Sequence, residues 1–530
     1  MSRTYGHSSD SHFTEIASAN IKRSSFNRSH GSKLTCDAGF IVPIFVDEVL
    51  PGDTFNLRLT ALGRLATPIY PLMDNVRIFT HFFFTPNRLL WDHWENFCGT
   101  EDSPGSKTDY VIPTLKVNPQ VGDVADYFGL PLQTKTYKVT ALPFRAHNLI
   151  YNEYFRDENL QSPMHVNTSD GPDQDGWYLL MRSRKVKDYF TSAFPWPQKG
   201  TASFINDIGD LAVTSSADYP DKAQMNYDAP SGANGHFRAG NSSWNVEFNS
   251  ISHHDEPLYH DPDNHADGLI ITSKLTGSVH TTVNALREAF AIQKILELDA
   301  RGGTRYFEIL RAHFGTYSPD SRLQRPEYLG GGISRLDVTQ VAQTSSTATA
   351  SPQGNLSAFA TAEINNHGFK KSFVEHGYVH GYMLIRPDLT YQQGVDRMWT
   401  RKTKYDFYWP AFAHLGEQSI LNKEIFITGD KKKDKMVFGY QERWAEYRFK
   451  HSKILGYLRS GVSGSLDAWH LSQQWLDTPT LGEGFIQDQP PFKRVVAVPS
   501  QHHFIFDMYW KFITARPMPV YSTPGSLDRF

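Results

Sequence analysis

The sequence predicts a mainly β protein whose antiparallel strands form a sandwich with large loops. Aromatic residues make up 13% and charged residues 21% of the 530-residue chain, and its 38 glycines and 30 prolines supply many turns. Strand patterns lie towards both ends of the chain, whereas helical patterns and an irregular segment lie between them. We therefore expect strands that are distant in sequence to pair within one antiparallel sandwich.

The first strands follow a polar segment and are separated by a turn at 51–53. In the second of them, Phe55, Leu57 and Leu59 alternate with more polar residues, which predicts one buried and one exposed face. The next run, 76–84, ends in three phenylalanines that break the alternation. We expect that strand to be covered on both faces.

The rest of the chain holds further helix and strand patterns. The predicted helices are 89–97, 142–154, 283–300 and 304–314, and the predicted strands are 378–386, 436–440, 495–498 and 504–508. Gly330 to Gly332 lacks a strand–turn–helix context, so we interpret it as a mobile loop rather than a phosphate-binding one. His376 and His380 are four residues apart, which places them on one face of a strand as buried or interfacial histidines.

Charge is distributed unevenly along the chain, although the formal net charge is only -3. Residues 201–270 carry 2 lysines and arginines against 11 aspartates and glutamates, a net of -9. Residues 397–459 carry 14 against 7, a net of +7. This polarity suits a protein with one face towards solvent or a cell and another towards a partner or nucleic acid. Ordinary variation between loops and core is the competing interpretation.

Residues 1–36 form a polar segment with few apolar side chains and no clear period. We interpret it as an arm that orders only against a partner, and a plain disordered tail is an equal alternative. Its basic residues make it a candidate for contact with single-stranded DNA through Lys22, Arg23 and Arg28.

Two basic and aromatic segments are candidate contact surfaces. Trp, Tyr and Arg carry much of the energy of protein–protein contacts, which favours an interface in 439–460. A second cluster interleaves cations with aromatic residues between 397 and 409, and single-stranded DNA and a subunit interface suit it equally. The interface candidates are Tyr440, Arg443, Trp444, Tyr447 and Arg448, and the DNA candidates are Arg401, Lys402 and Lys404. We interpret the lysine run 431–435 as a solvated turn rather than a phosphate site.

No motif for phosphate-binding, metalloprotease or nucleophile-elbow chemistry occurs in the sequence. His253, His254, Asp255 and His260 have metal-ligand chemistry, but two prolines lie in their run, and we favour a solvated acidic loop. The runner-up function is a carbohydrate-binding or glycoside-cleaving β-sandwich. Its conceivable carboxylate pair is Glu442 and Glu446, which arginine and tryptophan flank. We expect no enzyme activity and no cofactor.

Cys36 and Cys98 form neither a CxxC pair nor a disulfide framework, which fits a reducing cytoplasm. The N-terminus has no apolar signal core, and no apolar run approaches the ~20 residues of a membrane helix. We therefore expect no membrane insertion.

Four segments together resemble the major capsid protein of the Microviridae, small phages with circular single-stranded DNA, and most closely the gokushovirus branch. They are Gly39 to Trp94, Arg301 to Glu308 (RGGTRYFE), Gly439 to Ser460 (GYQERWAEYRFKHSKILGYLRS) and Arg516 to Tyr521 (RPMPVY). The resemblance implies an eight-stranded antiparallel jelly roll for 37–530. It also implies pentamers and a T=1 icosahedral shell in the virion, assembled in the host bacterial cytoplasm around single-stranded DNA.

The same resemblance implies further partners: minor or pilot proteins, DNA-binding proteins of the virion, and a host cell-surface receptor. Gokushovirus-like members carry an insertion that protrudes at each threefold axis and is thought to meet the host. We assign that role to 201–270, the acidic and irregular segment. The host-attachment candidates are Asp221, Trp244, Asp255 and Asp263.

Overall fold

The computed structural model describes residues 22–133, 135–200, 283–349 and 352–521, together with four three-residue strands between 213 and 273. The chain divides into two compact units. One comprises Met1–Lys199 and Glu297–Phe530, and the other is Gly200–Leu296. In the second unit, β8 (Val213–Ser215) pairs with β11 (Ile271–Ser273) and β9 (Asn226–Asp228) pairs with β10 (Asn234–His236), both antiparallel.

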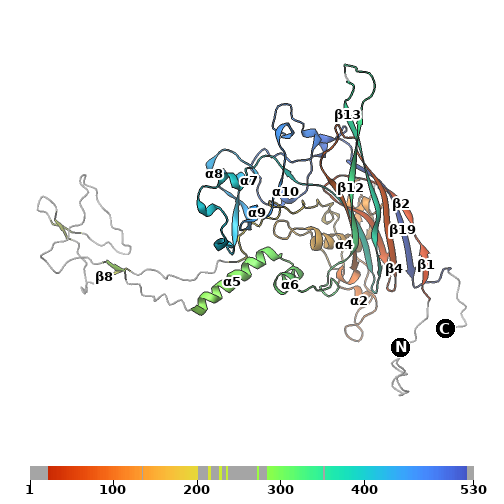
Figure 1. Cartoon of the computed structure of the whole chain (residues 1–530). Coiled ribbons are helices and arrows are strands. Elements are labelled where there is room, and N and C mark those ends of the chain that lie inside the picture. The colour runs from red at the N-terminus through yellow and green to blue at the C-terminus, as the bar shows by residue number, and fades with distance from the viewer. Residues whose placement is uncertain are drawn as a thin grey trace. The chain divides into compact units, whose positions relative to one another are not determined.

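A nine-stranded antiparallel sheet dominates the larger unit (Figure 1), which confirms the predicted mainly β fold. Its strands follow the order β1-β19-β4-β13-β12-β5-β14-β3, and β2 also pairs with β19. The sheet curls into a half-barrel, as in a jelly-roll capsid fold with long loops. The strands are β1 (Ser24–Asn27), β2 (His30–Cys36), β3 (Ile41–Val49), β4 (Thr54–Leu65), β5 (Val76–Pro86), β12 (Glu327–Ala342), β13 (Leu356–Ser372), β14 (Gly377–Pro387) and β19 (Phe504–Arg516).

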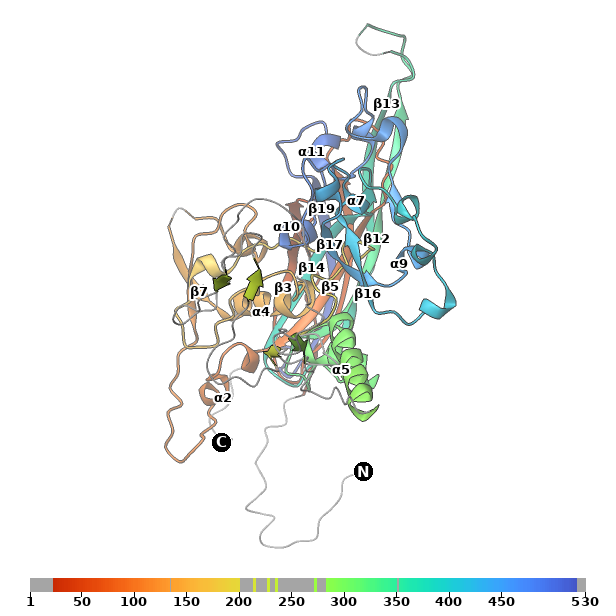
Figure 2. The same ribbon diagram turned by 90° about the vertical axis from the view of Figure 1, so that its left-hand side faces the viewer.

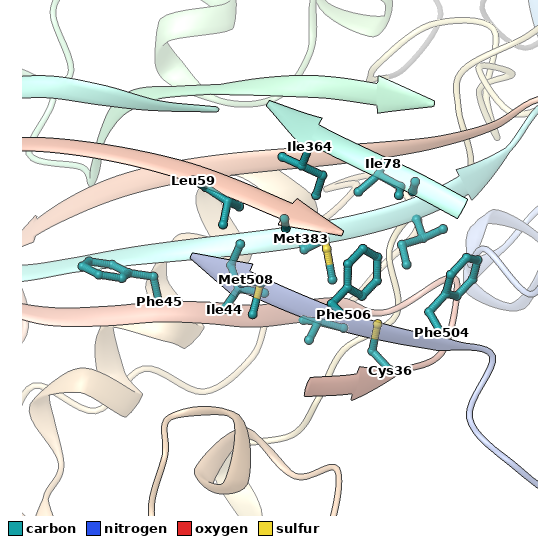
Figure 3. Close-up of a cluster of buried hydrophobic side chains, with 14 of the residues drawn as sticks. Cys36, Ile44, Phe45, Leu59, Ile78, Ile364, Met383, Phe504, Phe506 and Met508 are labelled. Atoms are coloured by element: carbon teal, nitrogen blue, oxygen red, sulfur yellow. The ribbon is translucent and has the colours of Figure 1, made fainter. Parts of the chain in front are cut away.

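The main hydrophobic core fills the inside of this curl (Figure 3). Alternate residues of β4 are buried, as predicted, and Leu57 and Leu59 lie opposite Phe512 and Trp510 of β19. Phe45 of β3 reaches across the curl to within 5.1 Å of the Trp510 ring. Aromatic contact between β3 and β19 therefore closes the two halves of the sheet onto one core.

A second layer covers the outer side of the half formed by β3, β14 and β5 (Figure 2). Helix α4 (Leu142–Ile150) continues into a π-helical turn, Tyr151–Phe155. Together they confirm the predicted helix 142–154. Phe155 packs on Phe83 of β5 and on Tyr382 of β14. This layer explains why the phenylalanines at 82–84 are all buried, and it confirms coverage on both sides for that part of the strand, whereas Arg77 near its start is exposed.

The start of the sheet differs from the predicted arm. Residues 24–27 and 30–36 form β1 and β2, and both pair with β19 within the same chain. The polar sequence did not predict these strands, because they form through backbone hydrogen bonds to β19, which require no apolar side chains. The sheet therefore begins about a dozen residues before the predicted boundary at residue 36.

Two other predictions are wrong. Gly330 to Gly332 belongs to β12, and a Cβ atom on Gly331 would lie 1.9 Å from the carbonyl oxygen of Thr80 on β5. These glycines permit close strand approach instead of forming a loop. The predicted strand 495–498 is mostly irregular, and Val495 ends the helical turn Phe492–Val495. A short apolar run cannot distinguish the two structures by periodicity.

The remaining elements are short, apart from two helices. Helix α5 spans Val283–Gly302, and α6 spans Tyr306–Phe314, which ends as predicted at Gly315 in a left-handed conformation but begins after Arg305 rather than Thr304. His376 precedes β14, so only His380 of the predicted pair lies in that strand. The other elements are α2 (Trp94–Phe97), β6 (Thr114–Val117), α3 (Val124–Tyr127), β7 (Tyr137–Thr140), β15 (Thr390–Tyr391), β16 (Glu417–Leu421), α7 (Asn422–Ile425), α8 (Lys431–Asp434), β17 (Val437–Glu442), α9 (Ala445–Arg448), β18 (Ser452–Lys453), α10 (Glu483–Ile486) and α11 (Phe492–Val495). Within the described part of the chain, no helix is both long and apolar enough to cross a bilayer.

Candidate functional site

The predicted interface segment is folded around one tryptophan. Trp444 has a positive φ of 68° between β17 and α9, and only 3% of its side chain is exposed. Its indole nitrogen donates a hydrogen bond of 3.0 Å to the carbonyl oxygen of Phe412, and the Arg443 guanidinium stacks 4.7 Å from its ring. Trp444 is therefore an internal anchor, which its helix-like spacing in the sequence did not reveal.

Arg401 connects the two predicted contact surfaces. Its guanidinium lies 4.4 Å from the centre of the Tyr447 ring and 5.2 Å from that of Phe407. It also pairs with the Glu446 carboxylate at 3.3 Å, and only 8% of its side chain is exposed. Glu446 neutralises this arginine within the chain, so Arg401 holds the two segments together.

These contacts leave a group of aromatic side chains exposed, which we call the aromatic patch. Tyr408 and Tyr447 link the two parts of the patch at a ring distance of 6.4 Å. Groups of exposed apolar side chains mark interaction sites on soluble proteins when they are large. The patch consists of Trp399, Tyr405, Phe407, Tyr408, Trp409, Tyr447 and Phe449, whose exposed fractions run from 46% to 73%.

The other predicted interface residues divide into inner and outer ones. Tyr440 exchanges two backbone hydrogen bonds with Phe194, at 2.7 and 2.8 Å, and so secures β17. Tyr447 and Arg448 are exposed. Arg448 pairs with Glu442 at 2.5 Å. The exposed interface candidates are thus the two at the end of α9.

Neither carboxylate of the runner-up glycosidase pair is free for acid–base chemistry. Glu442 is held by Arg448, and Glu446 accepts from Arg401 and from the Gln418 amide at 2.6 Å. Both carboxylates therefore stabilise the segment that carries the aromatic patch.

Two basic residues of the predicted arm, Arg23 and Arg28, have structural partners. Arg28 forms two hydrogen bonds to Asp47 on β3, at 2.5 and 2.9 Å, and stacks 4.9 Å from the Phe512 ring. Arg23 donates to Thr54 and to the carbonyl oxygen of Ala515. The accessible members of the predicted DNA set are the four exposed ones, Lys22, Arg23, Lys402 and Lys404.

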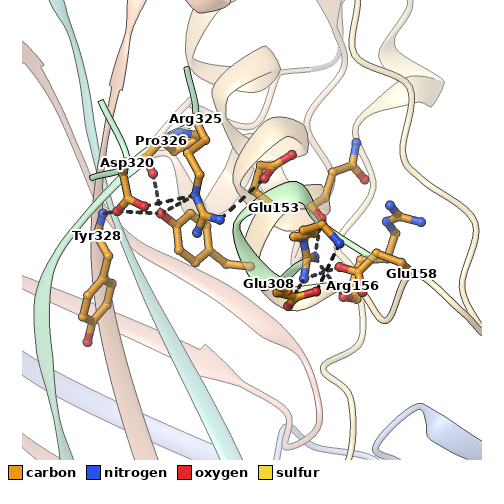
Figure 4. Close-up of polar contacts among 11 residues, drawn as sticks. Glu153, Arg156, Glu158, Glu308, Asp320, Arg325, Pro326 and Tyr328 are labelled. Carbon is orange, nitrogen blue, oxygen red and sulfur yellow. Dashed lines mark hydrogen bonds and ion pairs between the residues drawn. The ribbon is translucent and has the colours of Figure 1, made fainter. Parts of the chain in front are cut away.

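The segment 301–308, which resembles the capsid family, is fixed by an ionic network (Figure 4). Arg305 pairs with Glu158 and donates to the carbonyl oxygen of Asn152 at 2.7 Å. Nearby, the Arg325 guanidinium lies 4.0 Å from the Phe307 ring and pairs with Asp320 at 3.2 Å. The network ties α6 to the turn after α4 and to the start of β12, which is an architectural role.

A buried ion pair supports the layer beside the sheet. Arg145 of α4 and Asp173 form two hydrogen bonds of 2.7 and 2.8 Å, and both side chains are fully buried. Burial raises the pKa of Asp173, but hydrogen bonds from Arg145, Tyr178 and Asn167 outweigh it and hold that pKa below its ordinary value. Both charges have partners, so the pair fixes the loop around Asp173 to α4 rather than forming a reactive site.

The predicted metal residues His253, His254, Asp255 and His260 lie outside the described residues, as do Asp221, Trp244 and Asp263. Among the residues that the structure describes, no group of three histidine, cysteine, aspartate or glutamate side chains is arranged to hold a metal ion.

A curled antiparallel sheet with long connections, one of which carries the aromatic patch, is the architecture of a structural protein of the viral-capsid class. Residues 14–526 match the family described as capsid protein (F protein). The chain is 44% identical over 529 residues to capsid protein VP1 of Bdellovibrio phage phiMH2K, with 98% of each chain covered. It is 43% identical over 579 residues to capsid protein VP1 of Chlamydia phage 1 and 33% identical over 537 residues to that of Spiroplasma virus 4, each with 97% of both chains covered.

The chain therefore belongs to this capsid family, in its gokushovirus-like Microviridae branch. The resemblance that the sequence predicted is confirmed. The protein is a structural component of a phage virion and not an enzyme.

Proposed function

We propose that copies of this chain assemble through pentamers into a T=1 icosahedral shell that encloses circular single-stranded DNA. The observation that carries this proposal is the 44% identity to a capsid protein VP1 along 98% of both chains. Assembly takes place in the cytoplasm of the host bacterium. Minor or pilot proteins and DNA-binding proteins of the virion are further partners.

The aromatic patch is the contact surface between copies in this proposal. Aromatic and arginine side chains dominate the energetic centres of protein interfaces, and the patch offers both in one place. The Arg401–Glu446 pair fixes the orientation of Tyr447 before a second copy arrives, which lowers the entropy lost on contact. Closure of a symmetric shell multiplies such modest contacts.

Residues 201–270 form a protrusion at the threefold axes that binds a host receptor. The separate unit Gly200–Leu296 and the net charge of -9 over 201–270 support this role. Asp221, Trp244, Asp255 and Asp263 are the proposed receptor contacts. Deleting 205–265 is expected to leave shell assembly intact and to reduce infectivity, whereas failure to assemble would show that the segment holds the shell together.

Nuclease treatment of particles purified from infected cells tests the shell itself. The proposal predicts uniform icosahedral particles by electron microscopy, with circular single-stranded DNA protected inside them. Dispersed protein with no protected DNA would contradict it.

A further inference from the structure

The two halves of the curled sheet differ on their outer sides. Helix α4 and the turn after it cover the half formed by β3, β14 and β5. No described helix lies over the half formed by β19, β4 and β13, which forms the right-hand side of the sheet in Figure 1. Its outward side chains are correspondingly exposed, including Tyr509 at 54%, Leu62 at 46% and Ile505 at 57%.

Cations on this open face lie close together across the strands. Lys511 of β19 is directly opposite Arg58 of β4, and on the other side of Arg58 lies Gly368 of β13, which has no side chain. Lys370 is two residues beyond Gly368 on the same face. Like charges directly opposite each other destabilise a sheet, and a bound anion would relieve their repulsion. We call Arg58, Lys370 and Lys511 the cationic row.

The cationic row has no carboxylate to neutralise it. None of its three side chains has a hydrogen-bond or ion-pair partner within the described residues. The carboxylates of this face, Asp507 and Glu363, both lie opposite Leu62, four residues along β4 from Arg58. At about 3.3 Å per residue this separation is roughly 13 Å, which exceeds the Debye length at physiological salt.

An exposed tyrosine lies between the two groups of charges. Tyr509 is opposite Thr60, one outward position from the cationic row. Cations that neutralise phosphates, next to aromatic faces on which bases stack, are the shared features of single-stranded nucleic-acid surfaces. An open sheet face that carries exposed aromatic side chains is also the platform on which some RNA-binding domains stack bases.

We propose that this open face, centred on Arg58, Lys370, Lys511 and Tyr509, binds the backbone and bases of single-stranded DNA. The inference rests on the proposed function, because it gives the enclosed DNA a place on the protein. The lysine run 431–435 is the competing basic cluster, but it follows the capping Asp430 and includes Asp434. The cationic row has no such neighbours.

Fluorescence anisotropy with the purified full-length protein and a labelled oligo-dT of about 30 nucleotides tests the binding. The variant combines Arg58→Gln, Lys370→Gln and Lys511→Gln, and the matched control combines Lys431→Gln, Lys432→Gln and Lys433→Gln. Each phosphate contact on a single strand contributes about 0.7 to the salt slope, so the variant should lower the slope by roughly 2 and the control should not change it. Equal loss in both, or no loss in the variant, would overturn the proposal.

A second variant separates stacking from charge. Tyr509→Leu keeps an apolar side chain but removes the aromatic ring. The loss of one base–aromatic stack should weaken binding about fivefold or more while leaving the salt slope unchanged. Unchanged affinity would remove Tyr509 from the site and contradict the proposed surface.

Particle analysis distinguishes this inference from the proposed function. The triple variant should form shells of ordinary appearance with less protected DNA than the lysine-run control. If the wild-type chain forms no shells, the proposed function fails whatever the anisotropy shows. If only the triple variant fails to assemble, the face is a contact between copies, and the DNA-binding inference is wrong.

Discussion

The sheet core and the segment 397–459 are both rich in aromatic residues, yet they place them in opposite environments. In the sheet, three aromatic side chains are at most 1% exposed: Phe55 of β4 and Trp510 and Phe512 of β19. The two strands that carry them are paired with each other. In 397–459, Trp399 is 73% and Tyr447 is 51% exposed. The number of aromatic residues in a segment therefore does not show whether they stabilise the fold or form a contact surface. The burial of each ring distinguishes the two.

The local pattern explains this difference. Strict alternation along β4 and β19 directs every second side chain into one core. The segment 397–459 consists of short helices, short strands and turns, so few of its rings can be buried together. We infer that the first region holds the chain in shape and that the second joins copies of it. The following substitutions test this division.

The largest effect is expected in the sheet. Trp510→Ala removes a fully buried ring from the core and should lower the free energy of unfolding by about 3–5 kcal/mol. Tyr447→Ala in the aromatic patch should cost less than ~1 kcal/mol. Urea unfolding followed by fluorescence compares the two. Equal losses would show that the patch belongs to the structural core.

A glycine substitution tests how closely the strands pack. Gly331→Ala places a Cβ atom 1.9 Å from the Thr80 carbonyl oxygen, so β12 or β5 must shift, at a cost of roughly 1–3 kcal/mol. Gly482→Ala is the matched control, because no atom lies within 4 Å of the new Cβ and the φ of Gly482 is -177°. Similar unfolding midpoints for the two variants would contradict the close strand approach.

Two buried histidines make the sheet and its covering layer sensitive to acid. Burial lowers the pKa of His147 to about 4 and that of His380 to about 3, so the folded state favours neutral rings. Above about pH 6.5, the pKa of an unfolded histidine, both states hold neutral rings and folding is not penalised. As the pH drops from about 6.5 towards 4, the unfolded chain binds the protons first, and the free energy of unfolding falls by about 1.4 kcal/mol per group and pH unit.

Carboxylates also titrate in this pH range, so two histidine variants are compared to identify the contribution of His380. His380→Leu should flatten the pH dependence of the urea midpoint between pH 6.5 and 4, whereas substitution of the exposed His414 by Gln should not. Parallel profiles for the wild type and His380→Leu would show that His380 does not couple folding to pH.

The smallest effect on stability is expected in the aromatic patch. Trp399→Ser combined with Phe407→Ser should change the free energy of unfolding by less than ~1 kcal/mol but prevent assembly. Val374→Ser with Leu476→Ser is the control, because these side chains are 83% and 91% exposed outside the patch. If both double variants assemble alike, the patch is not the contact between copies.

Sequence reasoning predicted those parts of the fold that local periodicity determines. The alternation of Phe55, Leu57 and Leu59 predicted β4, helical spacing predicted α5, and the stop at Gly315 predicted the end of α6. It missed β1 and β2, because their polar residues are held by backbone pairing with a strand some 480 residues away. It missed the role of Gly331, since the Thr80 carbonyl that requires a glycine comes from a distant strand.

The candidate site shows the same limit. The sequence identified the aromatic and basic segments but could not distinguish the buried Trp444 from the exposed Tyr447. It proposed Arg401 for DNA or a subunit interface equally, and it could not show the ion pair with Glu446, which is 45 residues away in sequence. The cationic row depends on the register of three strands, so no local pattern could reveal Arg58 beside Lys511.

Sedimentation velocity of the purified full-length chain tests the central claim, that this protein assembles with its own copies. The account predicts one fast boundary at the size of a closed shell, and only slow species for the Trp399→Ser, Phe407→Ser variant. A wild-type chain that sediments solely as a 60.2 kDa monomer under assembly conditions would contradict it.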